Sequence, residues 1–574
     1  MNAVRKYSLL LIVAFAAFLR FYQLGLNPPS LTWDEAAWGY NAYSLGIDGR
    51  DEFGRFLPLD YLESFGDFKP VVYAYLTILP VKIFGLNEFA VRFPSALLGT
   101  LTVLVTYLLV KRIFLSGTQN SILHWRIKNQ NHSLNLKTNF DKVELIALLS
   151  SFLLAISPWH IMLSRAAFEA NVATFFIVTG VWLFLNSIQG NKWLIVFSVG
   201  FFVASIYTFN AARIVSPILL ILLSLVFWRT LWKIKYQTLV AIVIGIVLVI
   251  PIVRFLVTPQ ASLRFKEVNI FSDIGIIERT NQEIENDNNT LWSKVLHNRR
   301  FVYAAEYLRH YLDHFNPNFL FIKGDGNPKF STQDVGQMYL WELPFFIAGI
   351  LFLFKRREGN WWIVPVWLLI GIIPAATARE TPHALRIEAA LPTFQIITAI
   401  GVIAFINMIS NIPPSLKLWR ASKYFKFFIV VFIFSLLFFN FSYHIHGYYV
   451  HYPREYSGEW QYGYKESVEY VRSVENSYNQ IFITSDLGRP YIYYLFYTKT
   501  DPRIFREDSV IKRDPFGFVT VEGFGKYHFA DHIVKGQKKG ESLYIQTPKK
   551  IPPKSKKLKN FYLLNNDISL IAYE

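Results

Sequence analysis

Two neighbouring carboxylates, Asp34 and Glu35, follow the first apolar stretch of the chain in the sequence Leu-Thr-Trp-Asp-Glu. Ionisable side chains are costly inside a bilayer, so an acidic pair at this place indicates a functional site that water can reach. A carboxylate can accept the proton of an attacking hydroxyl group. Lys69 lies in the same polar stretch, in the sequence Asp-Phe-Lys-Pro, and its ammonium group can bind a phosphate.

Other polar residues that could take part lie between later apolar stretches, and most are cations, carboxylates or imidazoles. A phosphate-bearing substrate would need this mixture, because cations stabilise a departing phosphate. The pattern therefore predicts group transfer from a lipid phosphate, although spacing alone does not name the group. Candidates to bind the phosphate are Lys69, Arg165 and Arg386, and candidates for other substrate contacts are His160, Glu169, His383 and Asp67.

Each of these residues also has a structural alternative. Asp34 and Glu35 could cap a helix that starts near Ala36, since carboxylates favour a helix N-terminus. Lys69 could extend its charge to the membrane surface, and His160 could simply hydrogen-bond to neighbouring loops. A divalent metal could sit between Asp34, His160 and Glu169, but no local ligand pattern such as His-x-x-x-His occurs, so no cofactor is assigned.

The elements that must position these residues are membrane helices. The chain is 53% hydrophobic with a mean hydropathy of +0.28, and several apolar runs approach the roughly 20 residues that cross a bilayer. The net charge of +17 falls largely in short loops, where Lys and Arg orient helices and meet lipid head groups, so a nucleic-acid partner is not expected. Cysteine is absent, which excludes disulfides and thiolate-bound metals. We therefore expect an all-α, multi-pass protein of the plasma membrane.

About eleven spans are expected from apolar length. Lys and Arg concentrate in every second loop, which places the N-terminus in the cytoplasm if 71–86 does not cross; we expect 71–86 to lie at the outer interface or to re-enter. The first run follows Arg5 and Lys6 and lacks a small-residue cleavage site, so we expect an uncleaved anchor. The spans are expected near 7–26, 90–110, 143–159, 172–188, 194–209, 212–228, 237–256, 339–354, 361–377, 390–408 and 426–443.

The chain divides by composition near residue 443. Residues 1–443 hold the spans, with outer loops at 27–89 and 257–338. Residues 444–574 are rich in lysine and in turn residues, and short β-like runs such as Gln-Ile-Phe-Ile-Thr alternate with a helical pattern. They predict a small α/β domain outside the cytoplasm. No phosphate-loop or dinucleotide fingerprint occurs in them.

Four motifs in the first part of the chain resemble the bacterial protein O-mannosyltransferases and the aminoarabinose transferases that modify lipid A. These are membrane glycosyltransferases of the GT-C fold that use polyprenyl-phosphate sugars. The resemblance is specific over about 1–114 and weaker over 145–213 and 320–400. The motifs are Trp-Asp-Glu at 33–35, Asp-Phe-Lys-Pro at 67–70, Phe-Gly-Leu-Asn-Glu at 84–88 and Val-Arg-Phe-Pro-Ser at 91–95.

The resemblance implies an inverting transfer of mannose or another hexose or pentose to a hydroxyl group on a lipid, glycan or protein. It implies that Asp34 is the catalytic carboxylate, with Glu35 beside it, and that Lys69 binds the donor phosphate. The loop 257–338 is too short for the β-trefoil domain of eukaryotic protein mannosyltransferases, which puts a protein acceptor in doubt. Three alternatives exist: a polymerase or ligase that uses a pyrophosphate-linked glycan, a transporter of lipid-linked sugar without chemistry, and an inactive homologue that acts as a partner. The presence of both Asp34 and Lys69 argues against the third. A transporter usually shows two similar halves, and none are visible in the sequence.

Overall fold

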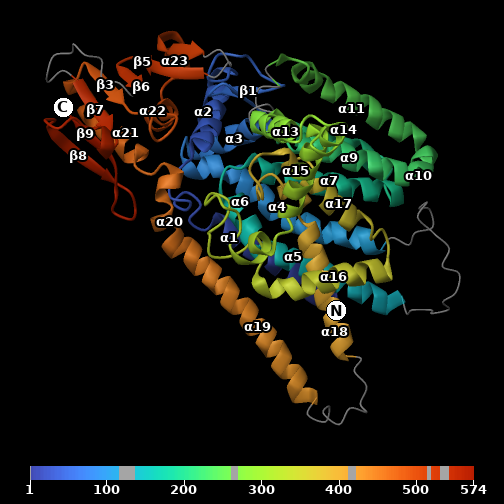
Figure 1. Ribbon diagram of the computed structural model, residues 1–574. Coiled ribbons are helices and arrows are strands. Elements are labelled where there is room, and N and C mark those ends of the chain that lie inside the picture. Colours follow the sequence, from blue (N-terminus) through green and yellow to red (C-terminus); the bar gives the residue numbers. More distant parts are fainter. Residues whose placement is uncertain are drawn as a thin grey trace.

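The computed structural model describes residues 2–115, 136–259, 261, 269–410, 422–513, 519–529 and 542–574. Most of these residues form a helical bundle, and the C-terminal residues form a β-sheet with short helices at one end of it (Figure 1). The N-terminus is in the helical part of the molecule, whereas the C-terminus follows the strand next to the edge of the sheet (Figure 1).

Helices lie at all eleven places where the sequence predicts a span. Four of them are long and apolar enough to cross a membrane: α4 (Glu88–Leu115), α7 (Glu169–Gln189), α11 (Lys235–Leu256) and a segment that begins inside α19 (Ser422–His446). A fifth candidate is the pair α5 (Leu136–Ile156) and α6 (Pro158–Arg165), which is bent by 56°. Four to five candidate spans are thus found, and eleven crossings stay a prediction. The other predicted spans hold α1 (Asn2–Phe21), α8 (Leu194–Ile206), α9 (Ala212–Val226), α16 (Leu343–Arg356), α17 (Ile363–Ile372) and α18 (Thr393–Ser410).

The bend between α5 and α6 has a local cause. Pro158 stands at the first position of α6, where a missing N–H costs nothing, and Ser157 accepts the N–H of His160 as the N-cap. The helix therefore restarts in a new direction. This turn brings the C-terminal end of α6 and the start of α7 toward the first outer loop, where the candidate residues lie.

The segment 27–89, which the sequence predicts to be the first outer loop, contains α2 (Trp33–Asp48), a hairpin of β1 (Leu62–Ser64) and β2 (Asp67–Lys69), and α3 (Val72–Phe84). The 13 residues of α3 span only about 20 Å at 1.5 Å per residue, less than the roughly 30 Å of a bilayer core. Helix α8, at a predicted span, also has 13 residues, so length does not decide whether α3 crosses. That 71–86 lies at the interface stays a prediction.

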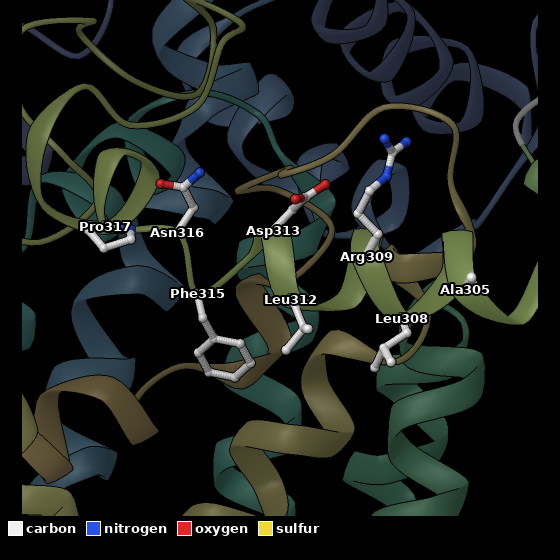
Figure 2. A pocket seen from close by; sticks show the side chains of 8 residues that line it. All are labelled: Ala305, Leu308, Arg309, Leu312, Asp313, Phe315, Asn316 and Pro317. Carbon is white, nitrogen blue, oxygen red and sulfur yellow. The ribbon is translucent and has the colours of Figure 1, made fainter.

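The predicted long outer loop contains three helices, α13 (Ile274–Asn286), α14 (Leu291–Leu296) and α15 (Arg299–Asp313), of which α13 and α15 are amphipathic. On α15 the apolar side chains of Leu308 and Leu312 lie on one side and those of Arg309 and Asp313 on the other (Figure 2). An open pocket of about 630 Å³ is lined by this helix and by the residues that follow it, as far as Pro317. None of the predicted site residues lines this pocket.

The C-terminal residues form a mixed seven-stranded sheet, as expected for an α/β region. The strand order is β4-β5-β6-β3-β7-β9-β8, and β3 runs parallel to both of its neighbours. The strands are β3 (Gln480–Ile483), β4 (Val510–Arg513), β5 (Val519–Phe524), β6 (Tyr527–Phe529), β7 (Ser542–Gln546), β8 (Lys557–Tyr562) and β9 (Ile568–Tyr573). The helices of this C-terminal region are α20 (Tyr452–Glu455), α21 (Tyr464–Val474), α22 (Pro490–Thr498) and α23 (Pro502–Asp508). In the helical bundle, the short helix α10 (Trp228–Lys233) lies between α9 and α11 in the chain.

The sheet region is joined to the first outer loop through a shared apolar core. Helix α22 packs against α2, and one continuous cluster of buried side chains includes Trp38 and Ala74 from the loop and Ile481 and Phe496 from the sheet region (Figure 1). Polar contacts reinforce this junction. The hydroxyl of Tyr493 donates to the carbonyl of Leu31 at 3.1 Å, next to the start of α2.

Candidate active site

Asp34 and Lys69 form an ion pair between Lys69 Nζ and Asp34 Oδ1. Asp34 stands in the first turn of α2, and its side chain is 53% exposed, whereas the side chain of Lys69 is only 10% exposed. The structure thus brings together the two residues that the sequence ranks first. The second oxygen of Asp34 has no hydrogen-bond partner among the described residues, so it is open to a substrate.

The β1–β2 hairpin places Lys69 at this point. Its two-residue turn is Phe65-Gly66, and both residues have positive φ, 60° and 78°, as a tight hairpin turn of this kind requires. The ammonium group of Lys69 lies 5.0 Å from the ring centroid of Phe65 and 5.4 Å from that of Trp38. Two aromatic faces therefore help to hold the cation next to Asp34.

Further carboxylates surround this pair. Glu169, the first residue of α7, lies close enough to Asp34, Lys69 and Asp67 for their charges to act on it. Asp67 stands two residues before Lys69 in the same strand. Beyond Glu169, burial raises the pKa of Glu388 well above its usual range, and the charge of Glu169 raises it further. The site is therefore acidic apart from Lys69 and the cations described below.

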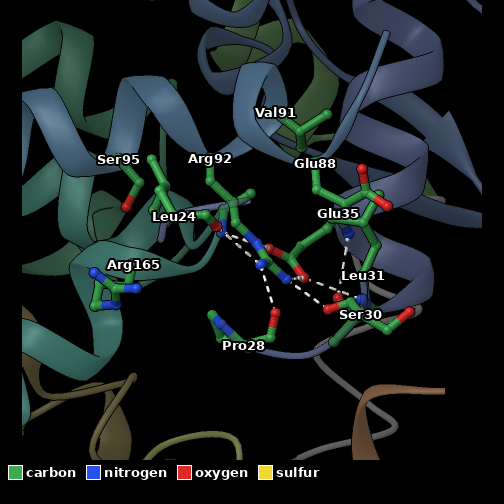
Figure 3. Close-up of polar contacts among 12 residues, drawn as sticks. Leu24, Pro28, Ser30, Leu31, Glu35, Glu88, Val91, Arg92, Ser95 and Arg165 are labelled. Carbon is green, nitrogen blue, oxygen red and sulfur yellow. Dashed lines mark hydrogen bonds and ion pairs between the residues drawn. The ribbon is translucent and has the colours of Figure 1, made fainter. Parts of the chain in front are cut away.

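Glu35 has a different environment from its neighbour. Its carboxylate is buried and accepts two bonds from Arg92, from Nε at 2.8 Å and from Nη2 at 3.2 Å. It also accepts the N–H of Ala167 at 2.9 Å and closes a capping box with Thr32. Figure 3 shows Glu35 and Arg92 facing each other beside the chain segment of Pro28 and Ser30. This placement is structural, and we do not assign Glu35 a part in the chemistry.

Arg165 is likewise fully buried and committed to the fold. Four of its bonds are made within the protein: to the carbonyls of Leu19, Arg20 and Asn27 and to the hydroxyl of Tyr448. A guanidinium group has five N–H donors, so little is left for a phosphate. The prediction that Arg165 binds the donor phosphate is therefore not carried forward.

His160 is also fully buried. Its Nδ1 lies 2.6 Å from Nη2 of Arg20, which is itself buried. A role for His160 at the site stays a prediction. Among the described residues, no group of three His, Asp or Glu side chains is placed to hold a metal ion.

His383 and Arg386 contact a different loop. The ring of His383 packs against that of Phe330 at a tilt of 37° with centroids 4.9 Å apart, and its Nδ1 is 3.9 Å from Oδ2 of Asp325. Asp325 accepts the N–H of Ala384 at 2.6 Å, and its pKa is raised to about 6 by burial. The charge of Arg386 acts on this Asp325–His383 pair. These residues thus support the loop around 323–339, and a role for Arg386 at the donor phosphate stays a prediction.

Two cations that the sequence did not single out lie beside the site. Lys329, next to Phe330, has its Nζ 5.0 Å from the ring of Trp33, and the charges of Glu459, Asp34 and Glu35 act on it. The guanidinium carbon of Arg489 lies 5.4 Å from the ring of Phe65. No local motif marks either residue, because each reaches the site from a segment distant in the chain.

Arg213 is another cation near the site, because the charge of Asp67 acts on it. Two of its buried nitrogens, Nε and Nη2, have no hydrogen-bond partner in the described part of the chain.

Comparison with known proteins identifies the fold. Residues 68–130 match the family profile described as dolichyl-phosphate-mannose-protein mannosyltransferase. The crystal structure of ArnT from Cupriavidus metallidurans in the apo state is similar over 98% of this chain and 97% of that one, with a TM-score of 0.51 and 12% identity. The chain thus has the fold of GT-C membrane glycosyltransferases, which confirms the resemblance drawn from the motifs.

Other matches are weaker or shorter. The oligosaccharyltransferase of Archaeoglobus fulgidus in the apo form aligns over 86% of this chain and 63% of that one, with 13% identity and a TM-score of 0.46. An uncharacterised protein from Aquifex aeolicus is 35% identical over 122 residues. That alignment covers 21% of this chain and 22% of the relative, so the chain spans less than a quarter of it.

Proposed function

We propose that the protein is an integral membrane glycosyltransferase that moves a sugar from a polyprenyl-phosphate donor to an acceptor hydroxyl group at the outer face of the membrane, with inversion. The observation that carries this proposal is the Asp34–Lys69 pair, in which a half-exposed carboxylate stands beside a lysine that is held in place by two aromatic rings. The profile match that includes Lys69 supports the same assignment.

The reaction is a single displacement. The acceptor oxygen forms a bond to the anomeric carbon while the bond from that carbon to the phosphate oxygen breaks. The acceptor proton passes to the carboxylate of Asp34, and the polyprenyl phosphate leaves with the electron pair of the broken bond. One N–H of the Lys69 ammonium binds Asp34, and its other donors remain for the phosphate.

The surroundings fit a donor that is part lipid and part polar. Phe65 and Trp38 give the base of the site an apolar wall, and the half-buried Glu169 and Asp67 offer acceptors for sugar hydroxyl groups. The transferred sugar is a hexose such as mannose, or a pentose, and the acceptor is a lipid, a glycan or a protein.

A transfer assay tests this proposal. Purified protein in detergent is incubated with a radiolabelled polyprenyl-phosphate hexose and a membrane extract as the source of acceptors. We expect label to move from the donor to a new product with the wild-type chain, and to stay on the donor with Asp34→Asn. Asp508→Asn is the matched control, because this acid is exposed at the end of α23. Undiminished transfer by Asp34→Asn would reject the assigned base.

A further inference from the structure

The Asp34–Lys69 pair is neutral as a unit, which leaves the charge of a donor phosphate uncompensated. Asp67 adds negative charge nearby, and Glu169 adds more when it is ionised, although burial raises the pKa of Glu169 to about 7. The bound donor is a phosphodiester with one negative charge, and the departing phosphate monoester carries about −1.5 to −2 at neutral pH. Stabilising this growing charge calls for cations other than Lys69 close to the site.

Lys329 meets this requirement by position. It stands in the outer loop between Gly324 and Tyr339, and its ammonium lies 5.0 Å from the ring of Trp33, the residue before Asp34. The charge of Asp34 acts on it, yet its ammonium has no hydrogen-bond or ion-pair partner among the described residues. It is half-buried, so its charge is only partly screened by water.

The backbone around Lys329 is held firmly. Asp325, four residues earlier, accepts the N–H groups of Asn327 at 2.8 Å and of Ala384 at 2.6 Å. Phe330, the next residue, packs between His383 and Phe168, which directly precedes Glu169. These contacts attach the loop that contains Lys329 to two other predicted outer loops.

Arg489 approaches from the sheet region. The residue before it, Gly488, touches the same Trp33: a methyl group there would lie 2.6 Å from the indole ring, and its φ of 111° also favours glycine. The guanidinium of Arg489 lies over the ring of Phe65, and Lys69 lies over the same ring. The two cations are therefore at most about 10 Å apart. Its side chain has no hydrogen-bond or ion-pair partner in the ranges that the structure describes.

We infer that Lys329 and Arg489 form, with Lys69, the subsite that binds the phosphate of the lipid donor, so that the sheet region and the long outer loop complete the active site. This inference rests on the proposed function. It gives the C-terminal region a part in catalysis: α22 packs on α2, and this contact sets Gly488 against Trp33. Donor binding is therefore expected to need the sheet region in its docked position.

Binding of three probes tests the inference: a polyprenyl monophosphate, the neutral polyprenol of equal length, and inorganic phosphate. Affinity is measured in detergent for the wild type, Lys69→Gln, Lys329→Gln and Arg489→Gln. Loss of one charge-assisted hydrogen bond is expected to weaken polyprenyl phosphate binding roughly 10-fold or more in each variant. Polyprenol binding is expected to stay unchanged, and Lys329→Arg to keep most of the affinity.

Matched controls come from the same segments. Lys323→Gln changes an exposed lysine of the same loop, and Arg503→Gln changes an exposed arginine of the sheet region; both are expected to bind like the wild type. Wild-type affinity in Lys329→Gln and Arg489→Gln, with a loss in Lys69→Gln, would overturn this inference but leave the proposed function standing. Equal losses for polyprenol, or binding of inorganic phosphate with no preference for the lipid, would also overturn it. A wild type that does not prefer the lipid phosphate to polyprenol would instead refute the proposed function.

Discussion

Asp34 and Glu35 are adjacent carboxylates, and the structure predicts opposite consequences for their removal. Glu35→Gln keeps the size and shape of the side chain but removes its charge. Arg92 then remains as a fully buried guanidinium without a counter-ion, although it still donates to the carbonyls of Leu24, Pro28 and Ser30. Breaking one partner of a buried pair costs about 3–5 kcal/mol of stability.

Asp34→Asn removes a charge that is half exposed to solvent. Lys69, whose side chain is only 10% exposed, would keep its charge without a counter-ion, so a loss of roughly 1–2 kcal/mol is expected. This loss is smaller than that of Glu35→Gln because water screens the exposed side of the pair. The reaction is expected to suffer more, because loss of a general base typically slows catalysis about 10²–10⁴-fold. One variant should therefore lose mainly stability and the other mainly activity.

The assay pairs thermal unfolding in detergent, followed by tryptophan fluorescence, with transfer activity per folded molecule. The double variant Glu35→Gln/Arg92→Gln should lose less than the sum of the single losses, because the two residues interact directly. A stable but inactive Glu35→Gln would make Glu35 a catalytic residue and refute this reasoning. An Asp34→Asn variant that loses as much stability as Glu35→Gln would also refute it.

Three further predictions concern the supports of the site. The pKa of Glu52 is raised to about 8 by burial and by the charge of Asp51, so the folded state holds this proton more tightly than the unfolded state. The stabilisation is complete below about pH 4.5 and is lost as the pH rises toward 8. In Glu52→Gln, the melting temperature should therefore fall less than that of the wild type over this pH range. Gly488→Ala should lose roughly 1 kcal/mol or more of stability and lower transfer, since a methyl group meets Trp33 at a positive φ, and a wild-type melting temperature and rate would contradict this. Arg165→Met should destabilise the fold by roughly 1–3 kcal/mol for each carbonyl left unsatisfied, while the folded fraction keeps its affinity for polyprenyl phosphate; a selective loss of that affinity would return Arg165 to the phosphate subsite.

The sequence predicted the features that depend on short patterns. Apolar length located a helix at every predicted span, and turn residues with β-like runs located the sheet region after residue 443. Asp34 and Lys69 were predicted because each lies in a short motif of the first outer loop, and the tight hairpin of that loop places Lys69 next to Asp34. The Thr-x-x-Glu pattern at residues 32–35 is a capping box, and it could have indicated that Glu35 is structural.

The rest of the site depends on tertiary contacts that leave no local pattern. A basic residue in an outer loop looks the same in the sequence whether it binds a substrate or backbone carbonyls, and Arg165 does the latter. Lys329 and Arg489 reach Trp33 and Phe65 only through the packing of a distant loop and of α22. The number of crossings also stays a prediction, because many apolar helices are too short for length alone to decide.

Side-specific labelling tests most directly whether the acid and the cations share one outward-facing site. The chain has no cysteine, so Asp34→Cys, Lys329→Cys and Arg489→Cys each provide a unique thiol, with Lys192→Cys as the control on a loop predicted to be cytoplasmic. In intact spheroplasts, a membrane-impermeant maleimide is expected to label the first three variants and to label Lys192→Cys only after permeabilisation. Labelling of positions 34 and 329 from opposite sides of the membrane would contradict the account.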